Sequence, residues 1–121
     1  MDELKIEELL GQTMVSVKNA DNEQLIFTTT DSHQYRFFHI QDCYECVRII
    51  DIAGHLDDLV GQPLLMAEES TNKENPPEEM QDESFTWSFY KFATVKGYVT
   101  VRWLGESSGL YSETVDFVKD W

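Results

Sequence analysis

The residues with the most chemical potential in this sequence are two histidines and two cysteines between positions 39 and 55. His39, Cys43, Cys46 and His55 offer imidazole nitrogen and thiolate sulfur, which are preferred protein ligands of zinc. Cys43 and Cys46 have the Cys-x-x-Cys spacing of a zinc half-site. The histidines are dispersed on either side of this pair, at a spacing unusual for a zinc site. These four residues are therefore weak metal candidates, and we expect no bound metal or other cofactor.

The same stretch could instead supply a thiol nucleophile. Cys43 would attack the substrate, His39 would remove the thiol proton, and Asp42 or Asp51 would orient the imidazole. A structural interpretation competes with both chemical ones: the stretch joins two strands, with one thiol packed inward as a small hydrophobe and one half exposed. The structural interpretation accounts best for the pattern, so we expect no catalytic residues and a protein that is not an enzyme.

Charge is the strongest compositional feature of the chain. Asp and Glu number 23 against 9 Lys and Arg, which gives a formal net charge of −14. Such a surface repels nucleic acid and anionic membranes, and it attracts basic protein surfaces that ordinarily hold nucleic acid. The alternative interpretation is that the acidic residues only confer solubility. The N-terminus has no signal-peptide pattern and no segment is long enough to span a membrane, so we expect a cytosolic protein with reduced thiols.

The elements that position these residues are mainly strands. A chain of 121 residues with 41% hydrophobic residues can bury a core without a metal or disulfide, and we expect a single domain over residues 1–121. A short helix is predicted at residues 2–10 and a short helical or turn segment at residues 55–60, each followed by glycine. Alternating apolar patterns predict eight strands in an α+β fold dominated by an antiparallel sheet: residues 13–18, 24–30, 34–41, 47–52, 64–68, 85–95, 98–103 and 110–118.

The centre of the predicted sheet is a hairpin over residues 85–103. Its arms are rich in aromatic and β-branched residues, and Lys96-Gly97 suits a two-residue turn. In that register Tyr90 lies opposite Trp103 on the core face, and Lys91 lies opposite Arg102 on the other face. The last predicted strand, residues 110–118, is expected to pack against the second arm of the hairpin.

Candidate partner-binding residues lie on and before this hairpin. The composition of residues 68–83 predicts an acidic flexible loop, because it is polar, contains two prolines and has almost no apolar residue. Three aromatic residues fall on the outer face of the hairpin, where either another element covers them or a partner protein does. The candidates are Phe85, Trp87 and Phe89 as anchors, with Glu68, Glu69, Glu78, Glu79, Asp82 and Glu83 as charges.

The sequence also contains one short internal similarity. Residues 6–12 (IEELLGQ) resemble residues 56–62 (LDDLVGQ), and each is an apolar-acidic-acidic-apolar-apolar turn followed by Gly-Gln and a predicted strand. Two explanations are open. The chain could contain a duplicated unit, or two unrelated short helices could end in the same way.

Several motifs resemble a family of short phage- and prophage-encoded proteins of unknown function, over roughly residues 35–118. In that family a second cysteine directly follows the first, where this chain has Tyr44, which weakens the metal interpretation. The resemblance implies a small accessory gene of a mobile element expressed in a bacterial cytosol. The motifs are residues 39–43 (HIQDC), 50–61 (IDIAGHLDDLVG), 86–90 (TWSFY), 94–97 (TVKG), 102–107 (RWLGES) and 109–112 (GLYS).

These features predict a non-enzymatic acidic binding protein derived from a phage. We expect it to occupy a basic surface of a host nucleic-acid-handling or defence protein, such as a CRISPR complex, and to act as an inhibitor that imitates nucleic acid. It would bind neither nucleic acid nor membranes directly, and it would be a monomer or a homodimer. The alternative is a small-molecule- or metal-binding protein that uses the region from His39 to His55.

Overall fold

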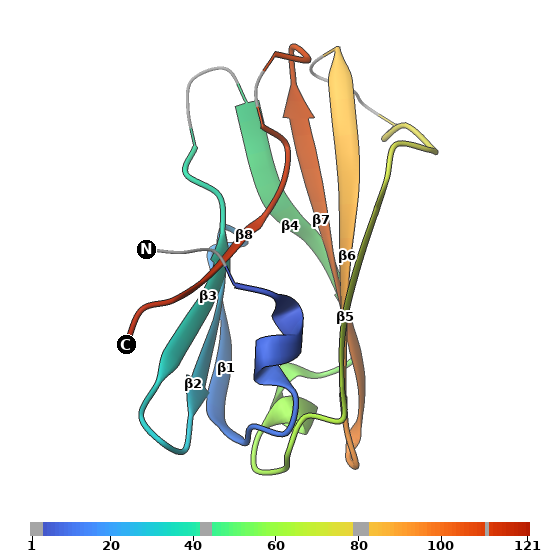
Figure 1. Cartoon of the computed structure of the whole chain (residues 1–121). Coiled ribbons are helices and arrows are strands. Elements are labelled where there is room, and N and C mark those ends of the chain that lie inside the picture. The colour runs from blue at the N-terminus through green and yellow to red at the C-terminus, as the bar shows by residue number, and fades with distance from the viewer. Residues whose placement is uncertain (1–3, 42–44, 79–82, 111) are drawn as a thin grey trace.

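Two antiparallel sheets packed face to face form this protein (Figure 1). The computed structural model describes residues 4–41, 45–78, 83–110 and 112–121. One sheet has the order β1-β2-β3-β8, built from Met14–Ala20, Gln24–Thr29, Gln34–Phe38 and Asp116–Lys119. The other has the order β4-β7-β6-β5, built from Glu45–Ala53, Gly97–Ser107, Ser84–Thr94 and Met66–Asn72. The predicted dominance of antiparallel sheet is confirmed.

The helical part of the α+β prediction is not confirmed. Within the described residues, the predicted helix at 2–10 and the predicted helical or turn segment at 55–60 are each a single 3-10 turn, η1 (Ile6–Leu9) and η2 (Leu56–Leu59). The fold is therefore mostly β. Nucleation of an α-helix is unfavourable, and a four-residue segment forms too few hydrogen bonds to offset it. Gly11 and Gly61 follow the two segments with φ of +81° and +87°, a left-handed conformation that ends a helix. No helix among the described residues is long and apolar enough to cross a membrane.

The hydrophobic core lies between the two sheets. Residues alternate along each strand, so that Tyr90 and Phe92 of β6 and Trp103 of β7 point inward and are buried. Phe37 of β3 stacks on Phe117 of β8 at a ring-centroid distance of 4.4 Å and reaches Phe92 across the core at 5.8 Å. Burial of each such side chain contributes on the order of 1.5–3 kcal/mol. The core thus depends on strands from both ends of the chain.

The central hairpin is present, but its predicted register is wrong by two residues. Thr94 pairs with Gly97, so Val95 and Lys96 make the turn, and Lys91 lies opposite Thr100 rather than Arg102. The inner and outer faces are unchanged, because a shift of two keeps the alternation. Tertiary contacts fix the turn: the Lys96 ammonium donates to the carbonyls of Asp57 and Val60, 3.1 and 3.0 Å away, beside η2.

The last strand also differs from the prediction. β8 covers only Asp116–Lys119, and it pairs with β3 in the other sheet instead of with the hairpin. The residues before it cross the inner side of β7, where Glu113 accepts hydrogen bonds from the hydroxyls of Thr86 and Ser107. A Cβ at position 105 would overlap the carbonyl oxygen of Glu113, so Gly105 permits this close approach. The crossing carries the chain from one sheet to the other.

The two halves of the chain repeat one unit. A 3-10 turn and three consecutive strands form η1-β1-β2-β3 in one half and η2-β5-β6-β7 in the other, and each fourth strand, β4 or β8, joins the opposite sheet. The two similar Gly-Gln segments lie side by side: Gly11 donates its N–H to the carbonyl of Leu64, and Gly61 donates to Met14, both at 2.9 Å. This reciprocal arrangement favours duplication as the explanation of the similarity between residues 6–12 and 56–62.

Candidate functional site

His39 is a buried structural residue, hydrogen-bonded on both sides of its ring. Its Nδ1 lies 2.8 Å from the carbonyl oxygen of Thr114, and its Nε2 lies 3.0 Å from Oε1 of Glu45. A carbonyl oxygen can only accept, so Nδ1 carries a proton. Both nitrogens are thus occupied, and neither is free to serve as the general base of the thiol hypothesis.

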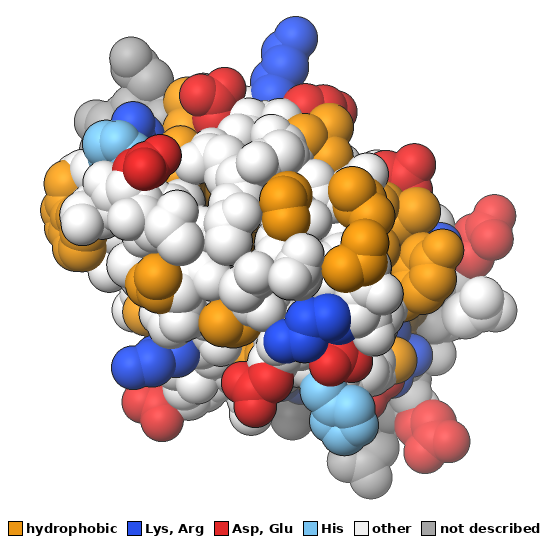
Figure 2. Space-filling view, turned by 90° about the horizontal axis from the view of Figure 1, so that it is seen from below, with side chains coloured by type: hydrophobic (Ala, Val, Ile, Leu, Met, Phe, Trp, Pro, Cys, Tyr) orange, Lys and Arg blue, Asp and Glu red, His pale blue; other side chains and the backbone are white. Residues whose placement is uncertain are grey.

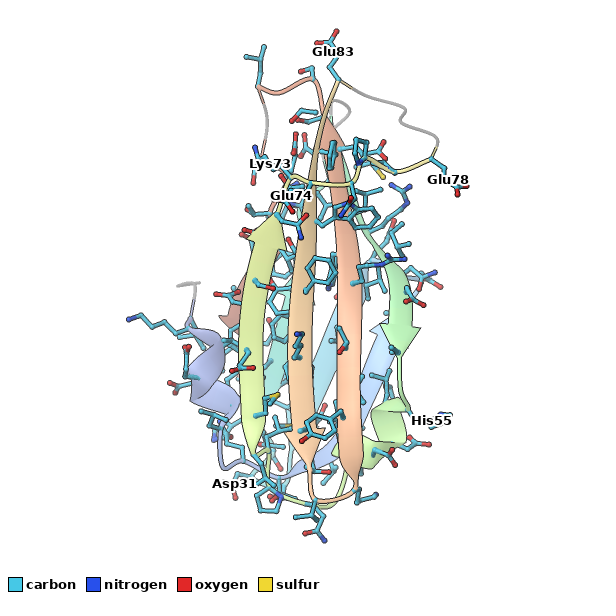
Figure 3. The ribbon with its side chains drawn as sticks, turned by 90° about the vertical axis from the view of Figure 1, so that its right-hand side faces the viewer. Asp31, His55, Lys73, Glu74, Glu78 and Glu83 are labelled. Carbon is cyan, nitrogen blue, oxygen red and sulfur yellow. The ribbon has the colours of Figure 1, made fainter. Side chains whose placement is uncertain are left out.

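The metal candidates that the structure describes lie apart. Cys46 is exposed near the start of β4, where its sulfur accepts a hydrogen bond from Arg48 at 3.2 Å. His55 is exposed beyond the other end of the same strand, at the lower end of the molecule (Figure 3). At about 3.3 Å per residue, β4 separates them by far more than two zinc–ligand bonds. Cys43 and Asp42 lie outside the described residues, and the described residues contain no metal-binding group of three.

The predicted aromatic anchors lie where expected, on the outer face of β6. Phe85, Trp87 and Phe89 are all half-buried, and they pair across the hairpin with Glu106, Leu104 and Arg102 respectively. The outer face therefore carries aromatic groups that no sheet covers (Figure 3). Only its upper part is sheltered, by the chain that follows β5.

That sheltering segment, residues 73–78, crosses the upper outer face (Figure 3). The indole N–H of Trp87 donates to the carbonyl of Asn75 at 2.9 Å and holds the segment against the sheet. Beneath it, Leu104 and Glu106 of β7 are 2% and 1% exposed. The prediction of a flexible loop at residues 68–83 is thus partly wrong. Residues 68–72 belong to strand β5, because each of them pairs with a residue of β6, from Glu68 with Lys91 to Asn72 with Trp87. Glu79 and Asp82 lie outside the described residues.

A pocket of about 560 Å³ lies between this segment and the sheet. Its aromatic and apolar walls include Trp87, Phe89 and Leu104, and two guanidinium groups, those of Arg48 and Arg102, line it. The guanidinium of Arg102 lies 4.9 Å from the Trp87 ring centroid. We call this the arginine pocket; its other lining residues are Ile50, Asn72, Glu74, Asn75, Pro76, Pro77, Glu78 and Glu106.

A second, smaller hollow of about 290 Å³ lies beside Phe89 and is dominated by carboxylates. We call it the acidic hollow; it is lined by Glu7, Glu68, Glu69, Ser70, Phe89 and Lys91. Glu68 and Glu69 on the edge strand β5 are exposed, as is Glu7 of η1. The structure thus brings Glu68, Glu69 and Phe89 of the predicted set together. Glu78 and Glu83 are exposed higher up (Figure 3).

Sequence reasoning missed Glu7, Arg48 and most of the arginine pocket. Glu7 and Arg48 come from η1 and β4, which are distant in sequence from the hairpin. The sheet order brings Arg48 to the hairpin, and the contact of η1 with β5 brings Glu7 to it. The outward alternation of Arg102 with Leu104 along the hairpin was the one available signal. Nothing in the local sequence of Arg48 indicated that it shares a pocket with Arg102.

Several hydrophobic side chains are exposed on the lower end of the molecule, shown from below in Figure 2. Leu65, Val95 and Tyr98 are 62%, 72% and 72% exposed. They lie near the β6–β7 turn, where Leu65 donates its N–H to the carbonyl of Ala93 and Tyr98 pairs with Ala93.

Two carboxyl groups outside the hollows have shifted pKa values. Burial by itself would raise the pKa of Glu113, but hydrogen bonds from Ser107, Thr86 and Ser84 outweigh it and hold this pKa below the usual value. Burial would likewise raise the pKa of Asp120, but hydrogen bonds from Arg36 and Gln34 and the Arg36 charge lower it. Arg36 binds Asp120 through two bonds of 2.7 and 3.0 Å. Both groups stabilise the fold.

Comparison with known proteins identifies one family. The model of a domain of unknown function, DUF7448, matches residues 7–117. No curated protein and no solved structure matches the chain. The expected likeness to an uncharacterised family is therefore confirmed, and the match brings no activity with it.

Proposed function

Since this chain belongs to the DUF7448 family, whose function is unknown, we propose from its own surface that it is a non-enzymatic binding protein. It docks the outer face of the β4-β7-β6-β5 sheet onto a basic surface of a partner protein. In the fuller form of the proposal, the gene is of phage origin, the protein works in a bacterial cytosol, and the partner is a host nucleic-acid-handling or defence protein that it inhibits. A CRISPR complex is one such partner.

The observation that carries this proposal is the acidic hollow beside Phe89. Three carboxylates, those of Glu7, Glu68 and Glu69, line it with Lys91 as the one cation among its lining residues. A lysine or arginine side chain of a partner fits a hollow of about 290 Å³ in size and charge. Phe89 offers an aromatic ring at its wall, which suits the cation or the stem of such a side chain.

The remaining charge distribution supports the same partner. The chain carries a net charge of −14, and Glu74, Glu78 and Glu83 are exposed above the outer face (Figure 3). Such a surface accelerates the approach of a basic protein and repels nucleic acid. A protein that normally holds nucleic acid presents a surface of this complementary charge.

The test is capture of the partner followed by binding kinetics with matched variants. Glu68→Gln with Glu69→Gln should lower the association rate several-fold, and the salt dependence should weaken with it. The control, Glu23→Gln with Asp31→Asn, removes the same charge from exposed turns of the other sheet. Phe89→Ala should mainly accelerate dissociation, because an aromatic anchor holds the complex once formed.

Nucleic acid should compete for the partner, and the protein itself should bind none. Raising salt from 0.1 to 1 M shortens the Debye length from roughly 10 to 3 Å, so association should slow steeply. A captured partner that is not basic would sink the proposal. So would binding that is indifferent to both salt and nucleic acid, or equal losses in the control variant.

A further inference from the structure

We propose that the arginine pocket binds a small planar molecule that carries one anionic group, a carboxylate or a phosphate. This site differs from the acidic hollow and takes a ligand of opposite charge, so it does not rest on the docking proposal above. Four observations carry it: the size of the pocket, two guanidinium groups that form no ion pair among the described residues, the aromatic walls and the segment that covers the pocket.

The size and lining of the pocket suit a small molecule. Its volume of about 560 Å³ falls within the roughly 300–1,000 Å³ typical of ligand sites. Trp87, Phe89 and Leu104 supply apolar and aromatic walls, and residues 73–78 supply a wall above the sheet. A planar ring can lie against these side chains and exclude water from them.

The two arginines come from adjacent strands. Arg48 of β4 lies opposite Leu104 of β7, and Arg102 is two residues from Leu104 on the same face. Diagonal neighbours of this kind have Cα atoms about 7–8 Å apart, within reach of one carboxylate or phosphate for side chains as long as arginine. A planar guanidinium binds either anion through two parallel hydrogen bonds.

Neither arginine forms an ion pair within the described part of the chain, although the carboxylates of Glu74, Glu78 and Glu106 line the same pocket. The ion pairs there are Arg36–Asp120 and His39–Glu45, although acidic residues outnumber basic ones 23 to 9 in the sequence. Among the described residues, the hydrogen bond that Arg48 donates goes to the sulfur of Cys46, a weak acceptor. Arg102 Nε is buried and has no hydrogen-bond partner among these residues. A buried donor of this kind is costly unless something accepts from it.

Packing holds Arg102 ready for such an acceptor. Its guanidinium lies 4.9 Å from the Trp87 ring centroid, and the indole N–H is fixed by the carbonyl of Asn75. The Trp87 ring restrains the guanidinium of Arg102, so this side chain loses less conformational entropy when an anion binds. The carboxylates of Glu74 and Glu78 also line the pocket and favour a ligand with N–H or O–H donors on its ring.

The two similar halves of the fold differ in the connection that covers this pocket. In the first half, β1 and β2 are joined by a short turn between Ala20 and Gln24, whereas β5 and β6 are joined by residues 73–83. The first residues of this longer connection, 74–78, form a wall of the pocket. Surface loops held by a rigid sheet commonly carry binding residues.

The experiment uses 2-naphthoate and 1-naphthyl phosphate as probes, with neutral 2-naphthamide as the matched control ligand. Isothermal titration should show binding of at least one anion, and binding of naphthamide about tenfold weaker or less, because it lacks the charge-assisted bonds. In ¹H–¹⁵N spectra the anion should shift the indole N–H of Trp87. Comparison of the titrations with 2-naphthoate and 1-naphthyl phosphate shows whether the site binds a carboxylate or a phosphate.

Arg48→Gln and Arg102→Gln should each weaken anion binding about tenfold, the loss expected for one charge-assisted contact. Lys18→Gln removes the same charge from an exposed position of β1, in the other sheet, and should change nothing. If Arg102→Gln fails to fold, Arg48→Gln decides. The proposal is overturned if neither anion binds, if naphthamide binds equally well, or if the arginine variants bind as the Lys18 control does.

Discussion

Glu113 is the buried carboxylate that holds the segment before β8 against β7. Its two oxygens accept from Thr86 and Ser107, and the pKa of Glu113 lies below its ordinary value of 4.5 because these bonds outweigh the cost of burial. The pKa of Asp120 is likewise below its ordinary value of 3.8. A carboxyl group with a lowered pKa binds fewer protons in the folded state than in the unfolded state. Both groups therefore stabilise the fold fully only above their unfolded pKa values.

The first prediction follows from this sign. The free energy of unfolding should fall as the pH drops below about 4.5 and through the lowered folded-state pKa values of Glu113 and Asp120. Glu113→Gln should cost about 1–3 kcal/mol at neutral pH and flatten this dependence, because the amide accepts fewer bonds. Urea unfolding between pH 3 and 7 measures both. Glu8→Gln, at an exposed position, is the control; equal slopes in wild type and Glu113→Gln would contradict the assignment.

The second prediction concerns the pair formed by His39 and Glu45. Because Nδ1 of His39 already donates to Thr114, the Nε2–Glu45 contact needs a further proton on one of the two groups. Oε2 of Glu45 is buried without a described partner. In Glu45→Gln the amide can donate to Nε2 without that proton.

Glu45→Gln should therefore change the free energy of unfolding by less than about 1 kcal/mol. Glu45→Ala leaves a buried ring nitrogen without a partner and should cost about 1–3 kcal/mol. Asp51→Ala, at an exposed position of the same strand, is the control. Chemical denaturation compares the three, and an equal cost for Gln and Ala would show that this hydrogen bond does not stabilise the fold.

At the scale of elements, sequence pattern predicted the strands and their faces but not what tertiary contacts decide. The alternation along residues 85–103 placed Tyr90 inward and Trp87 outward correctly, because burial of one face fixes that period. The hairpin turn was misplaced because Lys96 is bound by carbonyls of η2, far away in sequence. Both hollows depend on tertiary contacts that no local signal encodes: the sheet order brings Arg48 to the hairpin, and the contact of η1 with β5 brings Glu7 to it.

The third prediction concerns the segment that covers the outer face. Replacing residues 73–82 with a short Gly-Ser linker should leave the two sheets folded, since β5 and β6 pair only as far as Asn72 and Trp87. Exposing Leu104, now 2% exposed, should cost about 1–3 kcal/mol. Anion binding in the arginine pocket should be lost. Circular dichroism and thermal unfolding measure the first two effects, and unfolding of the variant would mean that the segment is required for the sheets.

At the scale of the whole molecule, the exchanged fourth strands bind the two halves together. β4 pairs with β7 over most of its length, and β8 closes the other sheet on β3. Each half therefore keeps three strands of its own sheet and gives one strand to the other. The core between the sheets likewise draws on both halves, with Phe37 and Phe92 in contact across it.

The last prediction is that the chain can be divided at the boundary of the repeat. Fragments 1–54 and 55–121 should each be largely unfolded alone, because neither has the sheet against which its apolar face packs. Mixed in equal amounts, they should associate and recover the β spectrum and cooperative unfolding of the intact chain. A cut between Asp31 and Ser32, inside the first unit, is the comparison, since it separates β1 and β2 from β3. Cooperative folding of either fragment alone would show that the exchanged strands are not what joins the halves.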